Sequence, residues 1–264
     1  MTVATFRKII WAHYKKRGRH DLPWRKTKNP YRILVSEVML QQTQVDRVIP
    51  FYKNFLKQFP TAKALAAAPL SEVLRAWQGL GYNRRAKMLR LAAQLLALKP
   101  VSTITEWEAL PGIGPYTARA VAAFARNENV VFVETNIRTV IIHHFFPTKK
   151  VIADTEIAKI LTKALPAGKS REWYSALMDY GSYLKQSGIS HNAKSKTFTK
   201  QKAFHGSLRE ARGAILRELL KKSQGTSLTS TLGAIRKEQL TAALAALIKE
   251  GLVEKKGRVY RLTT

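Results

Sequence analysis

The stretch that most constrains this chain is residues 110–125, which read Leu-Pro-Gly-Ile-Gly-Pro-Tyr-Thr-Ala-Arg-Ala-Val-Ala-Ala-Phe-Ala. Pro111 and Gly112 are expected to end one helix, and Gly114 to allow a second tight bend. From Tyr116 onward the sequence is rich in residues that favour a helix. A glycine turn that opens a helix leaves backbone N–H groups at the positive end of the helix dipole, where a phosphate can bind. The two glycines alone leave an ordinary connection between two helices as the alternative.

The charge of the chain favours a polyanionic partner. Its 264 residues hold 46 Lys and Arg against 17 Asp and Glu, which gives a formal charge of +29. The basic and acidic side chains number 29 and 12 in residues 1–184, five and none in 185–206, and 12 and five in 207–264. Because the excess is spread over the whole chain, it points to nucleic acid before membrane.

Several classes of site and location are excluded or disfavoured. The sequence has no cysteine, which excludes disulfides and any iron–sulfur or zinc–thiolate site. No apolar run approaches the roughly 20 residues that span a membrane. The first 20 residues are basic and amphipathic, as a transit peptide is, but Phe6, Ile10 and Tyr14 fall at helical spacing and favour a first core helix.

Apolar positions three or four apart predict that the first 184 residues are all-α. Residues 185–206 are rich in Ser, Thr and Lys and lack acidic side chains, which predicts a linker or a basic arm that lies on phosphate. The helical ranges predicted before that segment are 31–58, 61–67, 70–78, 83–98, 104–110, 115–126, 134–145, 154–165 and 171–184.

Residues 207–264 are predicted to form a winged-helix-like unit. Ranges 208–220 and 237–250 are helical, with a shorter apolar turn near 228–232. Apolar residues on both sides of a Lys-Lys-Gly turn then predict a β-hairpin. Such a unit serves as a second contact to a duplex or as a protein–protein module, and the first is favoured.

A candidate general acid lies in residues 36–45, Ser-Glu-Val-Met-Leu-Gln-Gln-Thr-Gln-Val. Glu37 is expected to open a helix inside an apolar run, and no basic side chain lies three or four residues away. Such surroundings raise the pKa of a carboxyl, which suits a general acid near neutral pH. A Glu that only complements the helix dipole is the alternative. The amides of Gln41 and Gln42 do not titrate and are typical of wedge or base-edge contacts.

A second glycine turn, in residues 77–85, opens a helix whose first turn carries Arg84, Arg85 and Lys87. Cations at that end oppose the helix dipole, so an anion is expected to offset them. Tyr82 beside them is placed to stack on bases. A solvated basic face is the alternative.

A second carboxyl follows an apolar run. Glu134 is expected at the start of a helix, with Thr135 and Asn136 as local caps. A carboxylate there stays ionised and can face a developing cation. One protonated and one charged carboxyl are what cleavage of a glycosidic bond requires.

Together, these segments resemble the helix-hairpin-helix DNA glycosylase superfamily, and most its adenine DNA glycosylase (MutY) branch. The resemblance covers roughly residues 5–184. Its carriers are Leu22-Pro-Trp-Arg25, residues 36–45, Gly79-Leu-Gly-Tyr82, residues 110–117, Glu134-Thr-Asn136 and Met178-Asp-Tyr-Gly181.

The resemblance implies two helical subdomains and an enzyme that flips a mispaired base, adenine, out of double-stranded DNA and hydrolyses its N-glycosidic bond without a diffusible cofactor. Glu37 would protonate the base, Glu134 would stabilise the oxocarbenium-like sugar, and Asn136 would position the nucleophile. Members that also cut the strand carry a Lys where Tyr116 stands here, which implies a monofunctional enzyme.

The resemblance also implies how the duplex is held. Gln41, Gln42 and Tyr82 would fill the gap or wedge the stack, and the amides of the hairpin would hold a phosphate, with a structural monovalent cation on its loop carbonyls. We expect a monomer in the cytoplasm, associated with the nucleoid. The candidate DNA-binding residues are Arg25, Gln41, Gln42, Tyr82, Arg84, Arg85, Gly112, Gly114 and Thr117.

Three departures from the family pattern qualify this expectation. Glu134 replaces the family's Asp, and the added methylene moves the carboxylate by about 1 Å, which can cost a hundredfold in rate. The four cysteines of the family's iron–sulfur cluster are absent, so the chain is clusterless, with residues 185–206 in place of the cluster loop. Residues 207–264 are too short for the family's domain that recognises oxidised guanine. Two alternatives therefore stay open: a glycosylase for mismatched uracil or thymine, and a catalytically weak protein that binds DNA lesions.

Overall fold

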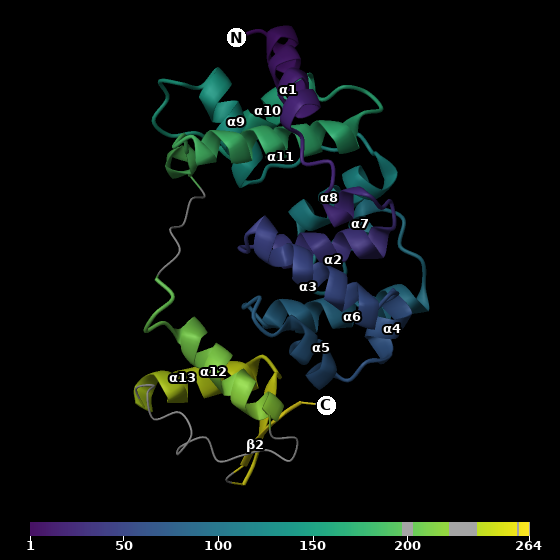
Figure 1. Cartoon of the computed structure of the whole chain (residues 1–264), viewed down its shortest axis with the longest axis vertical. Helices are drawn as coiled ribbons and strands as arrows, with labels where there is room; N and C mark the ends of the chain where they lie inside the picture. The colour runs from purple at the N-terminus through teal and green to yellow at the C-terminus, as the bar shows by residue number, and fades with distance from the viewer. Residues whose placement is uncertain (197–202, 222–236, 258, 264) are drawn as a thin grey trace. The chain divides into compact units, whose positions relative to one another are not determined.

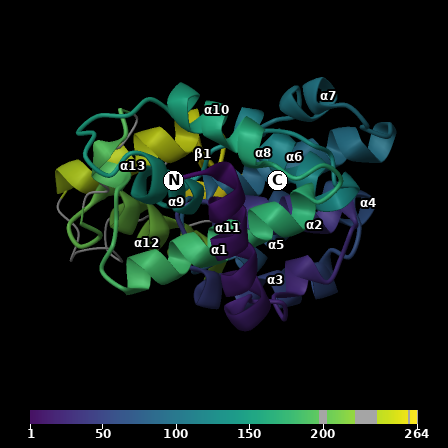
Figure 2. The ribbon, with the colours of Figure 1, turned by 90° about the horizontal axis from the view of Figure 1, so that it is seen from above.

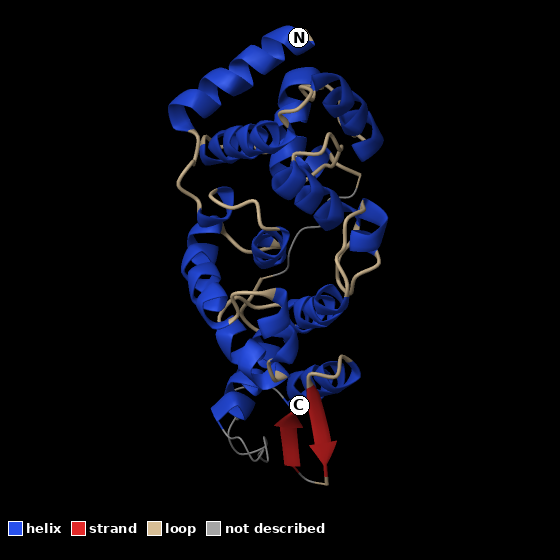
Figure 3. Ribbon diagram, turned by 90° about the vertical axis from the view of Figure 1, so that its right-hand side faces the viewer, coloured by secondary structure: helices blue, strands red, loops and turns tan. Residues whose placement is uncertain are grey.

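The computed structural model describes residues 1–196, 203–221, 237–257 and 259–263 of the chain (Figure 1). Helices dominate these residues, and the regular strands among them are the two of a C-terminal hairpin (Figure 3). The helices are α1 (Val3–Arg17), α2 (Pro30–Leu40), α3 (Val45–Gln58), α4 (Ala62–Ala67), α5 (Leu70–Trp77), α6 (Arg84–Leu98), α7 (Ile104–Glu108), α8 (Pro115–Arg126), α9 (Thr135–Phe145), α10 (Asp154–Ala164), α11 (Ser170–Gln186), α12 (Leu208–Lys221) and α13 (Lys237–Lys249), with short 3-10 turns at η1 (Pro23–Arg25) and η2 (Asn192–Lys194).

The chain divides into two compact units. Unit 1 comprises residues 1–37, 103–108 and 113–200, and unit 2 comprises residues 38–102, 109–112 and 201–264. Two helical subdomains were expected from the sequence, and each unit has its own helical core. None of the helices in the described ranges is both long and apolar enough to cross a membrane.

The core of unit 1 is built around α11, which packs against α1, α8 and α9. α1 crosses α11 (Figures 1 and 2) and buries Phe6 and Ile10 completely, so the predicted first core helix is confirmed. Gly181 lets α11 approach α9 closely, because a Cβ there would lie 2.5 Å from the backbone oxygen of Asn136. The first turn of α9 is therefore held against the middle of α11.

Unit 2 has a core between α3, α4, α5 and α6, in which Phe55, Leu65 and Trp77 are fully buried. Its C-terminal part pairs α12 with α13 and places both against the hairpin of β1 (Val253–Lys256) and β2 (Val259–Leu262). The strands are antiparallel with Val253 opposite Leu262, so the predicted hairpin is confirmed. The apolar turn predicted near 228–232 lies outside the described residues.

The range 31–58 was predicted as one helical stretch, but it is two helices, α2 and α3, separated by a turn. Gln42 adopts a φ of 56° in this turn, a left-handed conformation that ends α2. Arg85 stabilises the end of α2 by donating hydrogen bonds from Nη1 to the carbonyls of Val38, Met39 and Gln41, over 2.7, 3.0 and 2.6 Å. Last-turn carbonyls lack partners within their own helix, which is why a guanidinium from α6 fits there.

The first part of the predicted basic linker is folded. α11 continues to Gln186, and Ser195 forms an isolated parallel bridge with Ile152. The bridge is closed by hydrogen bonds from Ile152 N to Lys194 O and from Lys196 N to Ile152 O, over 2.9 and 3.2 Å. Residues 185–196 thus belong to unit 1 and do not form a plain linker.

Candidate active site

Glu37 lies in the last turn of α2 and not at a helix start, which corrects the sequence expectation. α2 begins seven residues earlier because Pro30 suits the first helical position and Asn29 caps it, its Oδ1 accepting from Arg32 N over 3.1 Å. The alternative role for Glu37, complementing the positive end of the dipole, is therefore excluded. Its side chain instead faces the protein interior, with the residue only 6 % exposed.

Tyr116 is the hydrogen-bond partner of Glu37. It is the second residue of α8, and its hydroxyl donates to Glu37 Oε2 over 2.9 Å. The pKa of Glu37 is raised to about 7: burial raises it most, the Tyr116 hydrogen bond offsets part of that rise, and the negative charge of Glu134 adds to it. Burial and Glu37 together keep the pKa of Tyr116 well above its ordinary value, so Tyr116 stays a donor. The carboxyl is thus poised to hold a proton near neutral pH.

Glu134 is itself the N-cap of α9, where Thr135 and Asn136 were expected as caps. Its Oε1 accepts from Ile137 N over 2.7 Å, the bond that an N-cap side chain makes to the third helical residue. Its Oε2 accepts from Thr135 Oγ1 over 3.1 Å and from Asn136 Nδ2 over 3.2 Å. The Glu134 side chain, longer by one methylene than that of an Asp, thus folds over the first turn of the helix that it caps.

The hairpin residues differ in what their backbone requires. Gly112 has a φ of 74°, and a Cβ there would lie 2.5 Å from the Cβ of Met88, so only glycine fits. Gly114 does not form the second tight bend that was expected: its φ is −93° and its ψ is 177°, which any residue adopts. A Cβ on Gly114 would meet open space, and α8 has no side-chain cap at this end. Thr117 is the third residue of α8, in its first turn, and is buried.

The remaining candidate DNA-binding residues include some that make contacts within the protein. Tyr82 has a strained φ of 48° and lies beside two guanidiniums, those of Arg85 and Arg209, at 5.4 and 5.5 Å from its ring centre. Arg85 also holds the turn that contains Gln41 and Gln42. Arg84 is exposed at the start of α6. Contact of these residues with DNA stays a prediction.

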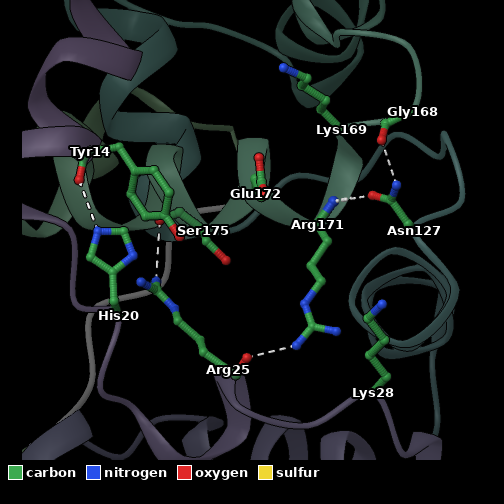
Figure 4. A pocket seen from close by; sticks show the side chains of 10 residues that line it. All are labelled: Tyr14, His20, Arg25, Lys28, Asn127, Gly168, Lys169, Arg171, Glu172 and Ser175. Atoms are coloured by element: carbon green, nitrogen blue, oxygen red, sulfur yellow. Dashed lines mark hydrogen bonds between the residues drawn. The ribbon is translucent and has the colours of Figure 1, made fainter.

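Arg25 is held by a buried carboxylate. Its guanidinium donates to both oxygens of Asp179 over 2.7 and 2.9 Å, and Asp179 also accepts from Arg19. Burial raises the pKa of Asp179, but these partners outweigh it and lower the pKa below its ordinary value. Arg25 also lines a cavity of about 530 Å³ in unit 1 (Figure 4), which neither Glu37 nor Glu134 lines.

The structure sorts the predicted residues by unit. Glu37, Tyr116, Glu134 and Asn136, the four catalytic candidates, all lie in unit 1, as do Arg25, Gly114 and Thr117. The other candidates, Gln41, Gln42, Tyr82, Arg84, Arg85 and Gly112, lie in unit 2.

The contacts of the site residues that the sequence did not predict include the hydrogen bond of Tyr116 with Glu37, the ion pair of Arg25 with Asp179 and the hydrogen bond of Lys185 with Thr135. For Lys185, the local signal in the sequence is its position four residues after Gly181 on one helical face.

Among the residues that the structure describes, no group of three or more His, Cys, Asp or Glu side chains is placed to hold a metal ion. Since the sequence has no cysteine, the residues present do not fit a cysteine-held iron–sulfur cluster. A monovalent cation on the hairpin carbonyls stays a prediction.

Two curated relatives each match about 70 % of this chain. An adenine DNA glycosylase of Mycolicibacterium smegmatis is 40 % identical over 190 residues, which cover 69 % of this chain and 63 % of the relative. An adenine DNA glycosylase of Buchnera aphidicola is 37 % identical over 193 residues, or 70 % of this chain and 54 % of the relative. The chain therefore matches less than two thirds of the length of these relatives.

Solved structures and a family model agree on the fold. A thermostable thymine-DNA glycosylase superposes with a TM-score of 0.59 at 25 % identity, covering 68 % of this chain and 85 % of that one. A complex of endonuclease III with DNA superposes with a TM-score of 0.58 at 21 % identity, covering 69 % and 87 %. The family model described as "HhH-GPD superfamily base excision DNA repair protein" matches residues 35–167, half of the chain. The chain belongs to the HhH-GPD superfamily of base excision DNA repair proteins.

Proposed function

We propose that this protein is a monofunctional DNA glycosylase that removes adenine from a mispair. The observation that carries the proposal is the coupled pair of carboxyls in unit 1. Glu37 is buried with a pKa of about 7, and Glu134 lies close enough for its charge to raise that pKa. The relatives named adenine DNA glycosylase support the choice of base.

Each carboxyl has a separate task in the proposed reaction. Glu37 in its protonated form donates to the purine ring, which makes the base a better leaving group. Tyr116 keeps its hydrogen bond to Glu37 and orients it. As the glycosidic bond breaks, positive charge develops on the sugar, and the carboxylate of Glu134 stabilises it. Asn136, whose amide is tied to Glu134, positions the attacking water.

Double-stranded DNA is the proposed partner, and the open N-terminus of α8 supports this. Gly114 leaves the backbone accessible there, and the dipole of a 12-residue helix attracts a phosphate. The charge of +29 supplies further phosphate contacts. The superposition with endonuclease III supports only the fold that presents this hairpin.

Single-turnover assays on a panel of duplexes, each with one mispair, test the proposal. Release of free adenine by the wild-type protein is expected, together with an abasic strand that stays uncut until alkali is added. Glu134→Gln, which removes the charge but keeps the hydrogen-bond acceptor, should slow release about 10²- to 10³-fold. Glu128→Gln is the matched control, because Glu128 pairs with Arg126 and not with the site.

The panel also distinguishes the alternatives. Release of thymine or uracil in place of adenine would favour a glycosylase for mismatched thymine or uracil, an alternative that the superposition with a thymine-DNA glycosylase supports. Tight binding without release from any duplex would favour a lesion-binding protein. Either result would refute the adenine assignment.

A further inference from the structure

Lys185 reaches the candidate active site from the opposite helix. It lies in the last turn of α11, is partly buried, and comes four residues after Gly181 on the same helical face. That face packs on the first turn of α9, where Gly181 meets the backbone of Asn136. The close approach of the two helices at Gly181 therefore brings the Lys185 side chain to the start of α9.

A chain of hydrogen bonds joins Lys185 to Glu134. The ammonium of Lys185 donates to Thr135 Oγ1 over 3.3 Å, and Thr135 Oγ1 is 3.1 Å from Glu134 Oε2. An ammonium has only donors and a carboxylate only acceptors, so the hydroxyl between them must accept from Lys185 and donate to Glu134. The direction of both bonds is thereby fixed, and both involve a charged group, which makes them stronger than neutral bonds.

We propose that Lys185 is a positioning residue for Glu134 and acts through the hydroxyl of Thr135. The inference deepens the proposed function, since it assigns what holds the carboxylate that faces the sugar. Glu134 has one more rotatable bond than an Asp, and Ile137 N fixes only its Oε1. Oε2 depends on Thr135 and Asn136. Thr135 is exposed, so without Lys185 its hydroxyl is free to turn toward water.

The surroundings of Lys185 agree with this role. Burial lowers the pKa of Lys185, the negative charge of Glu134 raises it, and the positive charge of Arg138 lowers it. Arg138 is itself paired with Asp154 through two hydrogen bonds of 2.9 and 2.8 Å. Arg138 is thus committed to Asp154, and Lys185 is a cation that the hydroxyl of Thr135 links to Glu134.

A double-mutant cycle tests the proposal. Lys185→Met and Thr135→Val should each slow single-turnover base release about threefold to tenfold at saturating protein, the effect of losing one positioning hydrogen bond. The double variant should be no slower than Thr135→Val alone, because the lysine acts only through the hydroxyl. Lys185→Arg and Thr135→Ser should restore most of the rate. Lys194→Met is the control, since Lys194 donates to the carbonyl of Pro147 and should leave the rate unchanged.

Two results would overturn the proposal. A Lys185→Met variant as fast as wild type excludes any positioning role. If Lys185→Met slows base release equally in the wild-type and the Thr135→Val backgrounds, the lysine acts directly on DNA or through space and not through the hydroxyl. If the wild-type protein releases no base, the proposed function fails, and the same double-mutant cycle is then measured by urea unfolding. Changes in the urea midpoint that are non-additive support the hydrogen-bond chain, and additive changes refute it.

Discussion

Replacing Glu37 with Gln should slow base release by orders of magnitude and make the protein more stable than wild type at alkaline pH. The amide oxygen of Gln can still accept from Tyr116, so the substitution removes the titrating proton and little else. Because general acids contribute about 10²- to 10⁴-fold, a loss of this size is expected in single-turnover release. The wild-type rate should also fall about tenfold per pH unit above pH 7, where Glu37 loses its proton, and the variant should lack this fall.

The stability effect follows from the raised pKa of Glu37. An unfolded Glu loses its proton near pH 4.5, whereas the folded one keeps it to about pH 7. Between these values the folded state binds one more proton than the unfolded state, so the free energy of unfolding falls as pH rises, by about 1.4 kcal/mol per unit. The contribution is fully present below pH 4.5, and about 3 kcal/mol of it is lost by pH 7.

Urea unfolding of the wild type and of Glu37→Gln at pH 5 and pH 8 measures this difference. The variant should gain about 2.5 kcal/mol relative to wild type between the two pH values, because it lacks the buried carboxyl that must ionise. Glu128→Gln, in which the exchanged carboxyl is partly exposed, should show no such gain. A Glu37→Gln variant that released base at the wild-type rate, or followed the wild-type pH dependence of stability, would refute the assignment of Glu37 as a buried acid.

Four further outcomes are expected. Tyr116→Phe removes a donor that lowers the pKa of Glu37, so the alkaline fall in the rate should move to higher pH, measured in pH–rate profiles; a downward move would contradict this. Gly181→Ala places a methyl group against the backbone of Asn136 and should cost about 1–3 kcal/mol in urea unfolding as well as slow base release. Gly114→Ala should keep the fold, at a cost of about 1 kcal/mol or less, yet weaken duplex binding in anisotropy titrations; unchanged affinity would argue against a phosphate at α8. Affinity for duplex should fall about 10³-fold or more between 50 and 200 mM salt, and a flat dependence would refute the electrostatic argument.

The helices were predictable because their signals are local. Apolar spacing, Pro, Gly and capping residues act within a few positions, so the ranges of α4 to α10 and the C-terminal hairpin follow from the sequence. The raised pKa of Glu37 was also predictable, since an apolar run with no nearby base indicates a desolvated carboxyl. The segment 31–58 was predicted less well, because the turn at Gln42 that ends α2 is stabilised by Arg85, more than 40 residues away.

Only the tertiary structure decided how the site residues meet. Tyr116 and Glu37 are 79 positions apart, Arg25 and Asp179 are 154 apart, and Lys185 and Thr135 are 50 apart. No local pattern encodes such pairs, because they depend on which helices pack and at what distance. The sequence by itself indicated which side chains are candidates for the chemistry and where most of the helices lie. Packing then decided which proton is held, which carboxylate is fixed and by what partner, because burial and contact exist only once distant segments have come together.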